Sequence, residues 1–209
     1  PWGAGLGGGS SDAATTLLAL NRLWGLNWPR ARLQQLALPL GADVPFFVGG
    51  RSAFVEGIGE QLTPLPAGTL AAQRFVVVKP PTPIATAGIF GSPLLVRNTE
   101  PVIVMSFLAD AQRAATLQKA ALQGCFWDFG RNDLQPPAEA SCPEVTQVAS
   151  WLAARHGNSR MSGSGSAVFA RIGSADQPLA NSLAEDLPPE WVGRLCCSLD
   201  CHPLVEWAS

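Results

Sequence analysis

The hydrophobic and polar positions follow a helical period in the first part of the chain and shorter, strand-length runs further on. The stretch Ala13–Leu20 carries no charge, and a helix that is apolar on every side is typically buried. We therefore expect a buried helix within Ser10–Trp24. Ser10, Ser11 and Asp12 precede it as candidate N-cap residues, because their side-chain oxygens accept hydrogen bonds from the free N–H groups of a first turn.

A second, amphipathic helix is predicted over Arg30–Leu38, where Leu33, Leu36 and Ala37 have helical spacing. The remaining predicted elements are a helix at Thr146–Arg155 and strands at Ser52–Glu56, Phe75–Lys79, Ser166–Arg171 and Trp191–Cys197. Helices and strands that do not alternate in strict βαβ order indicate the α+β class.

The segment Leu62–Thr69 contains two prolines and a glycine, which are typical of a loop between larger elements. We take it as the boundary between two domains, 1–68 and 69–209. No internal repeat is found in the sequence.

Composition narrows the class of protein. The 209 residues are 47% hydrophobic and only 14% charged, with a net charge of −2, so a core is expected and the basic stripe of a nucleic-acid binder is absent. No apolar run approaches the ~18 residues of a membrane span. Three of the five cysteines are Cys196, Cys197 and Cys201. Without a secretion signal they indicate reduced thiols in a cytoplasmic protein, with Cys196 and Cys197 expected in a buried strand.

The most informative stretch is rich in glycine and stands directly before the first predicted helix. Glycines let a backbone approach a ligand closely, and a helix N-terminus attracts anions. The stretch therefore predicts a phosphate site rather than a flexible linker. Its candidate ligand-binding residues are Pro1, Trp2, Gly3, Ala4, Gly5, Leu6, Gly7, Gly8, Gly9, Ser10 and Ser11.

Two familiar phosphate loops do not fit this stretch. Gly3, Gly5 and Gly8 satisfy the spacing G-x-G-x-x-G, but no acidic residue stands between Asp12 and Asp43 to bind a ribose. A nicotinamide-dependent oxidoreductase is therefore disfavoured. A Walker loop requires a lysine before its serine, and here a glycine takes that position.

Asp43 is the candidate for catalysis. It lies in the apolar segment Ala42–Phe47, where burial of an unpaired carboxylate would be costly. Such a cost is typical of functional residues. The alternative is an aspartate that caps a helix or a turn.

A second turn, Ser162–Ser166, alternates serine and glycine before the apolar run Ala167–Ala170. It could present backbone N–H groups to a phosphate, although tight turns before strands are common for structural reasons alone.

Together these stretches resemble the GHMP kinases. The resemblance is carried by Pro1–Ala14, Leu40–Pro45 and Arg160–Ser166, with further likeness at Asn132–Leu134 and around Glu56. It implies a two-domain fold: the remnant of an N-terminal domain like domain 2 of ribosomal protein S5, followed by a ferredoxin-like α/β-plait.

The resemblance also implies an activity. It is the transfer of the γ-phosphate of ATP, with Mg²⁺, to the 2-hydroxyl of a cytidine-diphosphate-linked methylerythritol in the non-mevalonate isoprenoid pathway. By resemblance, Asp43 is the catalytic base and the glycine-rich stretch binds the phosphates of ATP. Asp12 or Asp43 would approach the metal ion. The residues that resemble the family's substrate-binding positions are Thr86, Phe90, Gly163, Ser164 and Gly165.

The family pairs its aspartate with a lysine in an early Pro-Ala-Lys-Leu-Asn-type segment. The only lysines here are Lys79 and Lys119, and neither has that context. We therefore expect that an upstream segment supplies the lysine and that the 209 residues alone could be inactive. A homoserine or mevalonate kinase, or a nucleotide-binding protein without catalysis, is the alternative.

Overall fold

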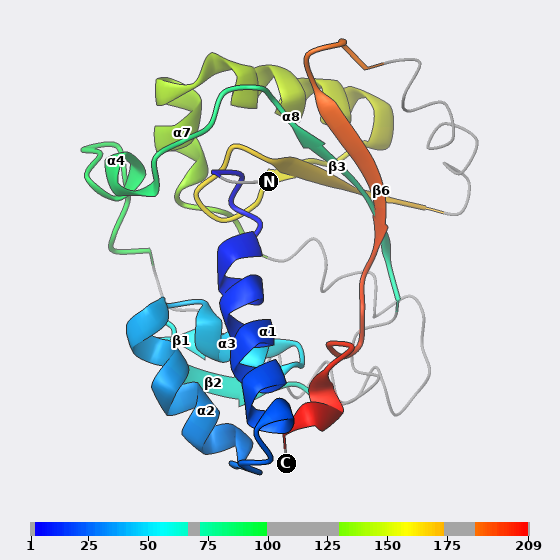
Figure 1. The fold of residues 1–209 in the computed structure, drawn as a ribbon. Coiled ribbons are helices and arrows are strands. Elements are labelled where there is room, and N and C mark those ends of the chain that lie inside the picture. Colours follow the sequence, from blue (N-terminus) through cyan, green and yellow to red (C-terminus); the bar gives the residue numbers. More distant parts are fainter. Residues whose placement is uncertain (1–2, 67–71, 100–129, 174–186, 209) are drawn as a thin grey trace. The chain divides into compact units, whose positions relative to one another are not determined.

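The computed structural model describes residues 3–66, 72–99, 130–173 and 187–208, which belong to two compact units (Figure 1). The helical unit comprises residues 7–66 and 199–208. The sheet unit comprises residues 3–6, 72–99, 130–173 and 187–198. The predicted boundary after residue 68 lies outside the described residues. The chain passes from one unit to the other within the glycine-rich stretch itself, between Leu6 and Gly7.

The helical unit packs three helices on one another and carries a two-stranded hairpin. Its core is formed by Leu18, Leu33, Val44 and Val48 together with small alanines. In chain order its elements are α1 (Gly8–Leu23), α2 (Arg30–Ala37), a 3₁₀ turn (Leu38–Leu40), α3 (Val44–Gly49), β1 (Ala53–Glu56), β2 (Gln61–Pro64) and a second 3₁₀ turn (Val205–Trp207).

The first helix differs from the sequence prediction at both its start and its surface. It begins at Gly8, with Gly7 as the N-cap residue, and no side chain caps it. The predicted caps Ser10, Ser11 and Asp12 are therefore wrong, because these residues already lie within the helix. Its buried side chains are Ala14, Leu18 and Asn21, which form one stripe, so burial on every side is also wrong.

The sheet unit contains four strands in the spatial order β4-β5-β3-β6, with each neighbouring pair antiparallel. The strands are β3 (Arg74–Lys79), β4 (Arg160–Met161), β5 (Val168–Ile172) and β6 (Val192–Cys197). The helices of this unit are α4 (Thr86–Phe90), α7 (Gln135–Ser141) and α8 (Pro143–His156). The mixture of helices with an antiparallel sheet confirms the α+β class.

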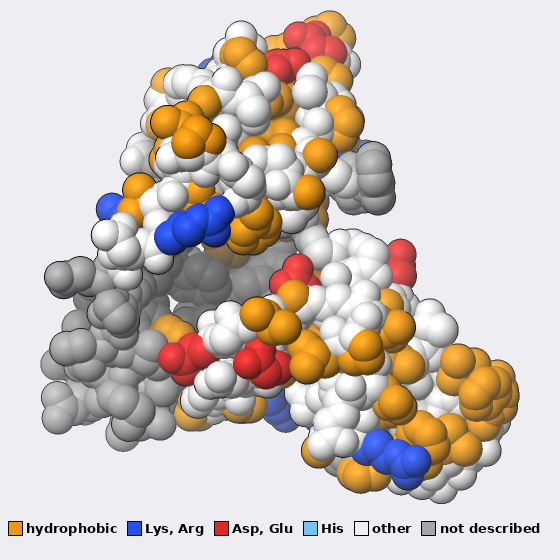
Figure 2. Space-filling view, turned by 90° about the vertical axis from the view of Figure 1, so that its left-hand side faces the viewer, with side chains coloured by type: hydrophobic (Ala, Val, Ile, Leu, Met, Phe, Trp, Pro, Cys, Tyr) orange, Lys and Arg blue, Asp and Glu red, His pale blue; other side chains and the backbone are white. Residues whose placement is uncertain are grey.

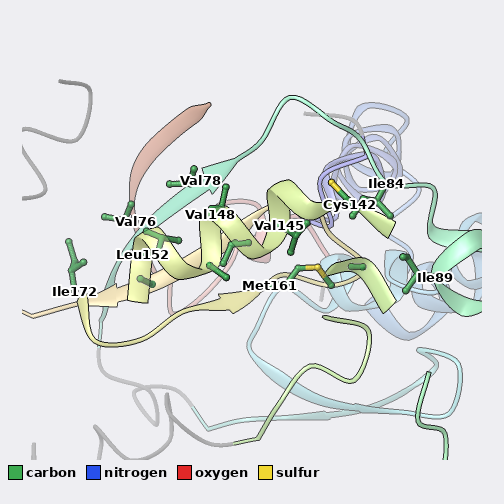
Figure 3. Packing of buried hydrophobic residues seen from close by; sticks show 14 residues of the cluster. Val76, Val78, Ile84, Ile89, Cys142, Val145, Val148, Leu152, Met161 and Ile172 are labelled. Carbon is green, nitrogen blue, oxygen red and sulfur yellow. The ribbon is translucent and has the colours of Figure 1, made fainter. Parts of the chain in front are cut away.

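Helix α8 covers one face of this sheet, and their shared side chains form the core of the unit (Figure 3). Val145, Val148 and Leu152 of α8 are fully buried against Val76 and Val78 of β3. The two valines are separated by one residue because alternate side chains of a strand point to the same face. This packing fixes the strand ends from which the loops of the candidate site extend.

The prediction that Cys196 and Cys197 are buried is wrong, since both are exposed. They lie on β6, which pairs only with β3 among the described strands. An edge strand is covered less than a central one, so hydrophobic composition alone did not bury it.

In the described part of the chain no helix has the length and apolar character needed to cross a membrane. On the face shown in Figure 2, lysine and arginine side chains stand in small separate groups rather than in a continuous stripe.

Candidate functional site

The N-terminus of α1 is open to a ligand. Gly7 has the left-handed φ of 65°, and a Cβ on it would lie 2.8 Å from the ring of Phe47. By contrast, a Cβ on Gly8 or Gly9 would meet no atom within 4 Å. The first N–H groups of a helix have no partner within the helix, and no acidic residue stands in this first turn. The arrangement is suited to an anion such as a phosphate.

Asp43 begins the helix that packs beside this N-terminus. It occupies the N-cap position of α3, yet its side chain makes no capping hydrogen bond. The alternative of a capping aspartate is therefore right about the position of Asp43, but the side-chain hydrogen bond of a cap is not made. The carboxylate is exposed, so our expectation that it is buried is wrong, because the apolar residues that surround it in sequence turn into α3 and away from it. Its carboxylate makes no hydrogen bond to another side chain or to the backbone among those of the described residues.

The backbone before Asp43 lies close to two other segments, and each contact involves a glycine. A Cβ on Gly41 would lie 4.0 Å from the Ser10 hydroxyl, which places this segment against the first turn of α1. A Cβ on Gly59 would lie only 2.1 Å from the carbonyl oxygen of Ala42. Only glycine allows the turn after β1 to press so closely on this segment. The segment that carries Asp43 is thus held by the close backbone approach of Gly59 to Ala42.

In the sheet unit, the start of the glycine-rich stretch lies on the turn Ser162–Ser166. The N–H of Ala167 donates to the carbonyl of Ala4 at 3.1 Å, and the N–H of Ser166 donates to that of Gly3 at 3.4 Å. The hydroxyl of Ser162 donates to the carbonyl of Gly5 at 2.8 Å. The two sequence motifs, separated by most of the chain, therefore meet through their backbones.

Thr86 joins the same turn, whereas Phe90 does not. The hydroxyls of Thr86 and Ser164 are 2.8 Å apart and share a hydrogen bond. Phe90 lies at the end of α4 with half of its surface exposed. An exposed ring is available to stack on a flat ligand.

A chain of hydrogen bonds links the turn Ser162–Ser166 to Glu144. The hydroxyl of Ser166 donates to the carbonyl of Thr82 at 2.7 Å, and the Thr82 hydroxyl donates to Glu144 at 2.6 Å. That hydrogen bond, with a second one from the Cys142 thiol, lowers the pKa of the Glu144 carboxyl. The carboxylate therefore stays charged at neutral pH and keeps accepting both bonds.

The structure thus groups the predicted residues into two sets. Gly3, Ala4 and Gly5 lie with Gly163, Ser164, Gly165 and Thr86 in the sheet unit, and Gly7, Gly8, Gly9, Ser10 and Ser11 lie with Asp43 in the helical unit. The side chain of Leu6 is exposed between them along the chain. Pro1 and Trp2 lie outside the described residues.

One further residue in contact with the turn Ser162–Ser166 is Asn132, which entered the sequence analysis only through the likeness to the GHMP kinases at Asn132–Leu134. The side-chain amide of Asn132 donates to the carbonyls of Met161 and Gly163, at 2.8 Å each. An asparagine far from this turn in the sequence gave no signal of its own, because the contact arises only when β4 is placed beside the loop before α7.

No group of three or more His, Cys, Asp or Glu side chains among the described residues could hold a metal ion. Mg²⁺ bound to phosphates needs only one or two protein carboxylates, since water and phosphate oxygens fill the other positions. Asp12 and Asp43, both exposed, could supply such a ligand to Mg²⁺.

Two separate parts of the chain match known protein families. Residues 1–51 match the family described as GHMP kinases N terminal domain. Residues 107–191 match the family described as GHMP kinases C terminal.

Among individual relatives, a 4-diphosphocytidyl-2-C-methyl-D-erythritol kinase from Methylibium petroleiphilum is 56% identical over 209 residues, which is all of this chain and 67% of the relative. The protein of the same name from Variovorax paradoxus is 48% identical over 100% of this chain and 69% of its own length. The chain therefore spans about two thirds of the length of these relatives.

Solved structures agree with these matches. A crystal structure of 4-(cytidine 5'-diphospho)-2C-methyl-D-erythritol kinase aligns with a TM-score of 0.65 at 32% identity, covering 94% of this chain and 66% of that one. Homoserine kinase from Cytophaga hutchinsonii aligns with a TM-score of 0.64 over 97% of this chain and 68% of that one, but at 16% identity. The second likeness shows the fold alone.

Proposed function

Because the chain belongs to the GHMP kinases and, within them, to the 4-diphosphocytidyl-2-C-methyl-D-erythritol kinases, we propose how its own residues carry out that reaction. The family activity is the transfer of a phosphoryl group from ATP to an alcohol. The acceptor is the 2-hydroxyl of 4-diphosphocytidyl-2-C-methyl-D-erythritol, in isoprenoid biosynthesis.

The observation that carries the proposal is the open N-terminus of α1 with Asp43 at the start of the helix packed beside it. The phosphates of ATP bind at Gly8, Gly9 and Ser10, where free N–H groups and the helix dipole favour negative charge. Among the residues that the structure describes, no side chain fills the space next to the two glycines. The phosphoryl groups can therefore approach the backbone closely.

Asp43 acts as the base. Its carboxylate takes the proton of the acceptor hydroxyl while the oxygen attacks the γ-phosphorus of ATP. The bond from that phosphorus to the β–γ bridging oxygen breaks, and ADP leaves. Phosphoryl transfer depends mainly on positioning and charge stabilisation, so an exposed carboxylate held by fixed backbone is sufficient for this role.

When bound, Mg²⁺ would neutralise charge on the phosphates. We assign its protein ligand to Asp12 or Asp43, the carboxylates closest in sequence to the phosphate-binding turn and to the start of α3. The acceptor binds in the sheet unit at Thr86 and at the turn Gly163–Gly165, with Phe90 free to stack on its cytosine. The reaction takes place in the cytoplasm, to which the free thiols of Cys196 and Cys197 are suited.

The test compares acceptors and one variant in the protein made from its complete reading frame. We expect ADP formation with ATP and 4-diphosphocytidyl-2-C-methyl-D-erythritol, and none above background with homoserine or mevalonate. Asp43→Asn should remove turnover and leave ATP binding intact. Turnover on homoserine or mevalonate would mean that the chain has the activity of another GHMP kinase. ATP binding without any turnover would indicate a nucleotide-binding protein without catalysis.

A further inference from the structure

We propose that Asn132 is a positioning residue for the phosphate-binding stretch, although it lies in neither glycine-rich motif. It acts by fixing the turn on which Gly3–Gly5 rest. This inference builds on the proposed function, because Gly3–Gly5 stand shortly before Gly8–Ser10, the residues of the same stretch that are assigned to the phosphates of ATP.

Two of the three hydrogen bonds of the Asn132 amide go to this turn, and the third stays within its own segment. Its Nδ2 donates to the carbonyls of Met161 and Gly163, both at 2.8 Å. Its Oδ1 accepts the N–H of Leu134 at 3.0 Å. A side-chain amide has two N–H donors and one carbonyl. This single group therefore links the segment before α7 to Met161 and Gly163, at the start of the turn.

The bend held by Asn132 is the part of the turn that contacts Gly5. A Cβ on Gly163 would lie 2.9 Å from the carbonyl oxygen of Gly5, and the Ser162 hydroxyl donates to that same oxygen. Residues 161–163 therefore carry the bonds to Asn132 on one side and the contact with Gly5 on the other. Gly5 is followed after one residue by Gly7, the N-cap of α1.

Only an asparagine supplies this combination at that reach. Aspartate would keep the acceptor for Leu134 but would face two carbonyl oxygens with a charged oxygen in place of an NH₂ group. Those carbonyls would lose their donor and be repelled. Glutamine would carry the amide one bond further. We therefore expect Asn132→Asp to release residues 161–163 while the side chain keeps its size.

The chain contains a matched control. Asn158 also donates to two carbonyls, those of His156 at 2.8 Å and Arg171 at 3.0 Å, and accepts the N–H of Arg171 at 2.8 Å. It belongs to the connection after α8 and does not contact the turn at Ser162–Ser166 in the hydrogen bonds of the described residues. Asn158→Asp removes the same kind of bonds from the same unit, so it reports the cost of structural damage alone.

The first experiment is amide hydrogen exchange on both variants, read in peptides that cover residues 3–7 and 160–167. We expect Asn132→Asp to speed exchange in both peptides by about tenfold or more relative to the unaltered protein, since about 1.4 kcal/mol of lost hydrogen bonding corresponds to that factor. Asn158→Asp should leave both peptides unchanged. Unchanged exchange in residues 3–7 of Asn132→Asp, or equal effects of the two variants, would overturn the proposal.

The second experiment measures ATP affinity and steady-state kinetics. We expect Asn132→Asp to raise the Kd and the KM for ATP by about tenfold with a smaller change in the KM for the acceptor, and Asn158→Asp to change neither at equal melting temperature. For Asn132→Ser, whose hydroxyl retains a hydrogen-bond donor, the Kd for ATP should lie between those of Asn132→Asp and the unaltered protein. Equal loss of ATP and acceptor binding would contradict positioning. If the unaltered protein bound no ATP, the proposed function would fail, while the exchange rates would still decide the role of Asn132.

Discussion

The carbonyl oxygen of Gly5 accepts a hydrogen bond from the Ser162 hydroxyl at 2.8 Å, and a Cβ on Gly5 would lie 2.1 Å from the Ser162 carbonyl oxygen. These two residues are 157 positions apart in the sequence and are in backbone contact. Glycine at position 5 is therefore required both by the close approach and by its positive φ of 67°. The contact brings the two glycine-rich motifs together.

From this contact we predict that Gly5→Ala separates the two motifs. The new methyl group would overlap a backbone oxygen that no rotamer change can move. We expect a fall in the free energy of unfolding of more than about 2 kcal/mol and loss of ATP binding. Thermal or denaturant unfolding together with ATP titration measures both.

Gly9→Ala is the matched change at the open end of the same stretch. A Cβ there would meet no atom within 4 Å, and alanine in a helix is favoured over glycine by about 0.5–1 kcal/mol. Stability should therefore be kept or raised, while ATP affinity falls because the methyl group stands beside the phosphate-binding N–H groups. An unchanged ATP affinity in Gly9→Ala would place the phosphates elsewhere.

Asp43→Asn tests the assigned base. The amide keeps the size of the side chain but cannot take a proton, so we expect kcat to fall by about 10²–10⁴ with little change in ATP affinity. Glu206→Gln changes another exposed carboxylate of the helical unit, outside the proposed site, and should keep most of the turnover rate. Stopped-flow or coupled measurement of ADP release distinguishes the two variants, and equal losses in both would remove the special role of Asp43.

The substitution Arg30→Met tests how much the Arg30 side chain contributes to the stability of the fold. Its guanidinium donates to the carbonyls of Val48, Val205 and Ala208, which joins the end of α3 to the last described residues of the chain. Burial, and less so the charge of Arg51, lowers the pKa of Arg30. Loss of these charged hydrogen bonds should cost about 2–3 kcal/mol of unfolding free energy.

Arg32→Met on the same helix is its control. The Arg32 guanidinium lies 3.6 Å from the centre of the Trp28 ring, and an exposed cation–π contact contributes only about 0.5–1 kcal/mol. Denaturant unfolding of both variants should show a clear difference in midpoint. Equal midpoints would mean that the bonds of Arg30 to the backbone add nothing.

Thiol labelling tests the edge strand. Cys196 and Cys197 are exposed, whereas Cys142 is buried, and burial, with the hydrogen bond to Glu144, raises the pKa of the Cys142 thiol. Since the thiolate is the reactive form, iodoacetamide near pH 8 should modify the first two well before Cys142. Peptide mass spectrometry follows each site. Early modification of Cys142 would contradict its place in the core.

Much of the secondary structure could be predicted because its pattern is local. The strand predicted at Phe75–Lys79 is observed as Arg74–Lys79, and the helix predicted at Thr146–Arg155 as Pro143–His156. By contrast, α3 and α7 were not predicted. Each has a proline in its first turn and is six or seven residues long, so its apolar period is too short to be distinguished from a loop.

The family, the glycine-rich stretches and the importance of Asp43 could all be proposed from the sequence, because each depends on residue types at fixed spacing. The exposure of Asp43, the start of α1 at Gly8 and the contact of Gly5 with Ser162 could not. Each is decided by which backbone segment approaches which across a long stretch of chain. Local propensity favoured Ser10 as a cap, but the helix begins at Gly8, after Gly7, which packs closely against the ring of Phe47. The sequence thus determined which groups are available, and tertiary packing decided which of them face a ligand.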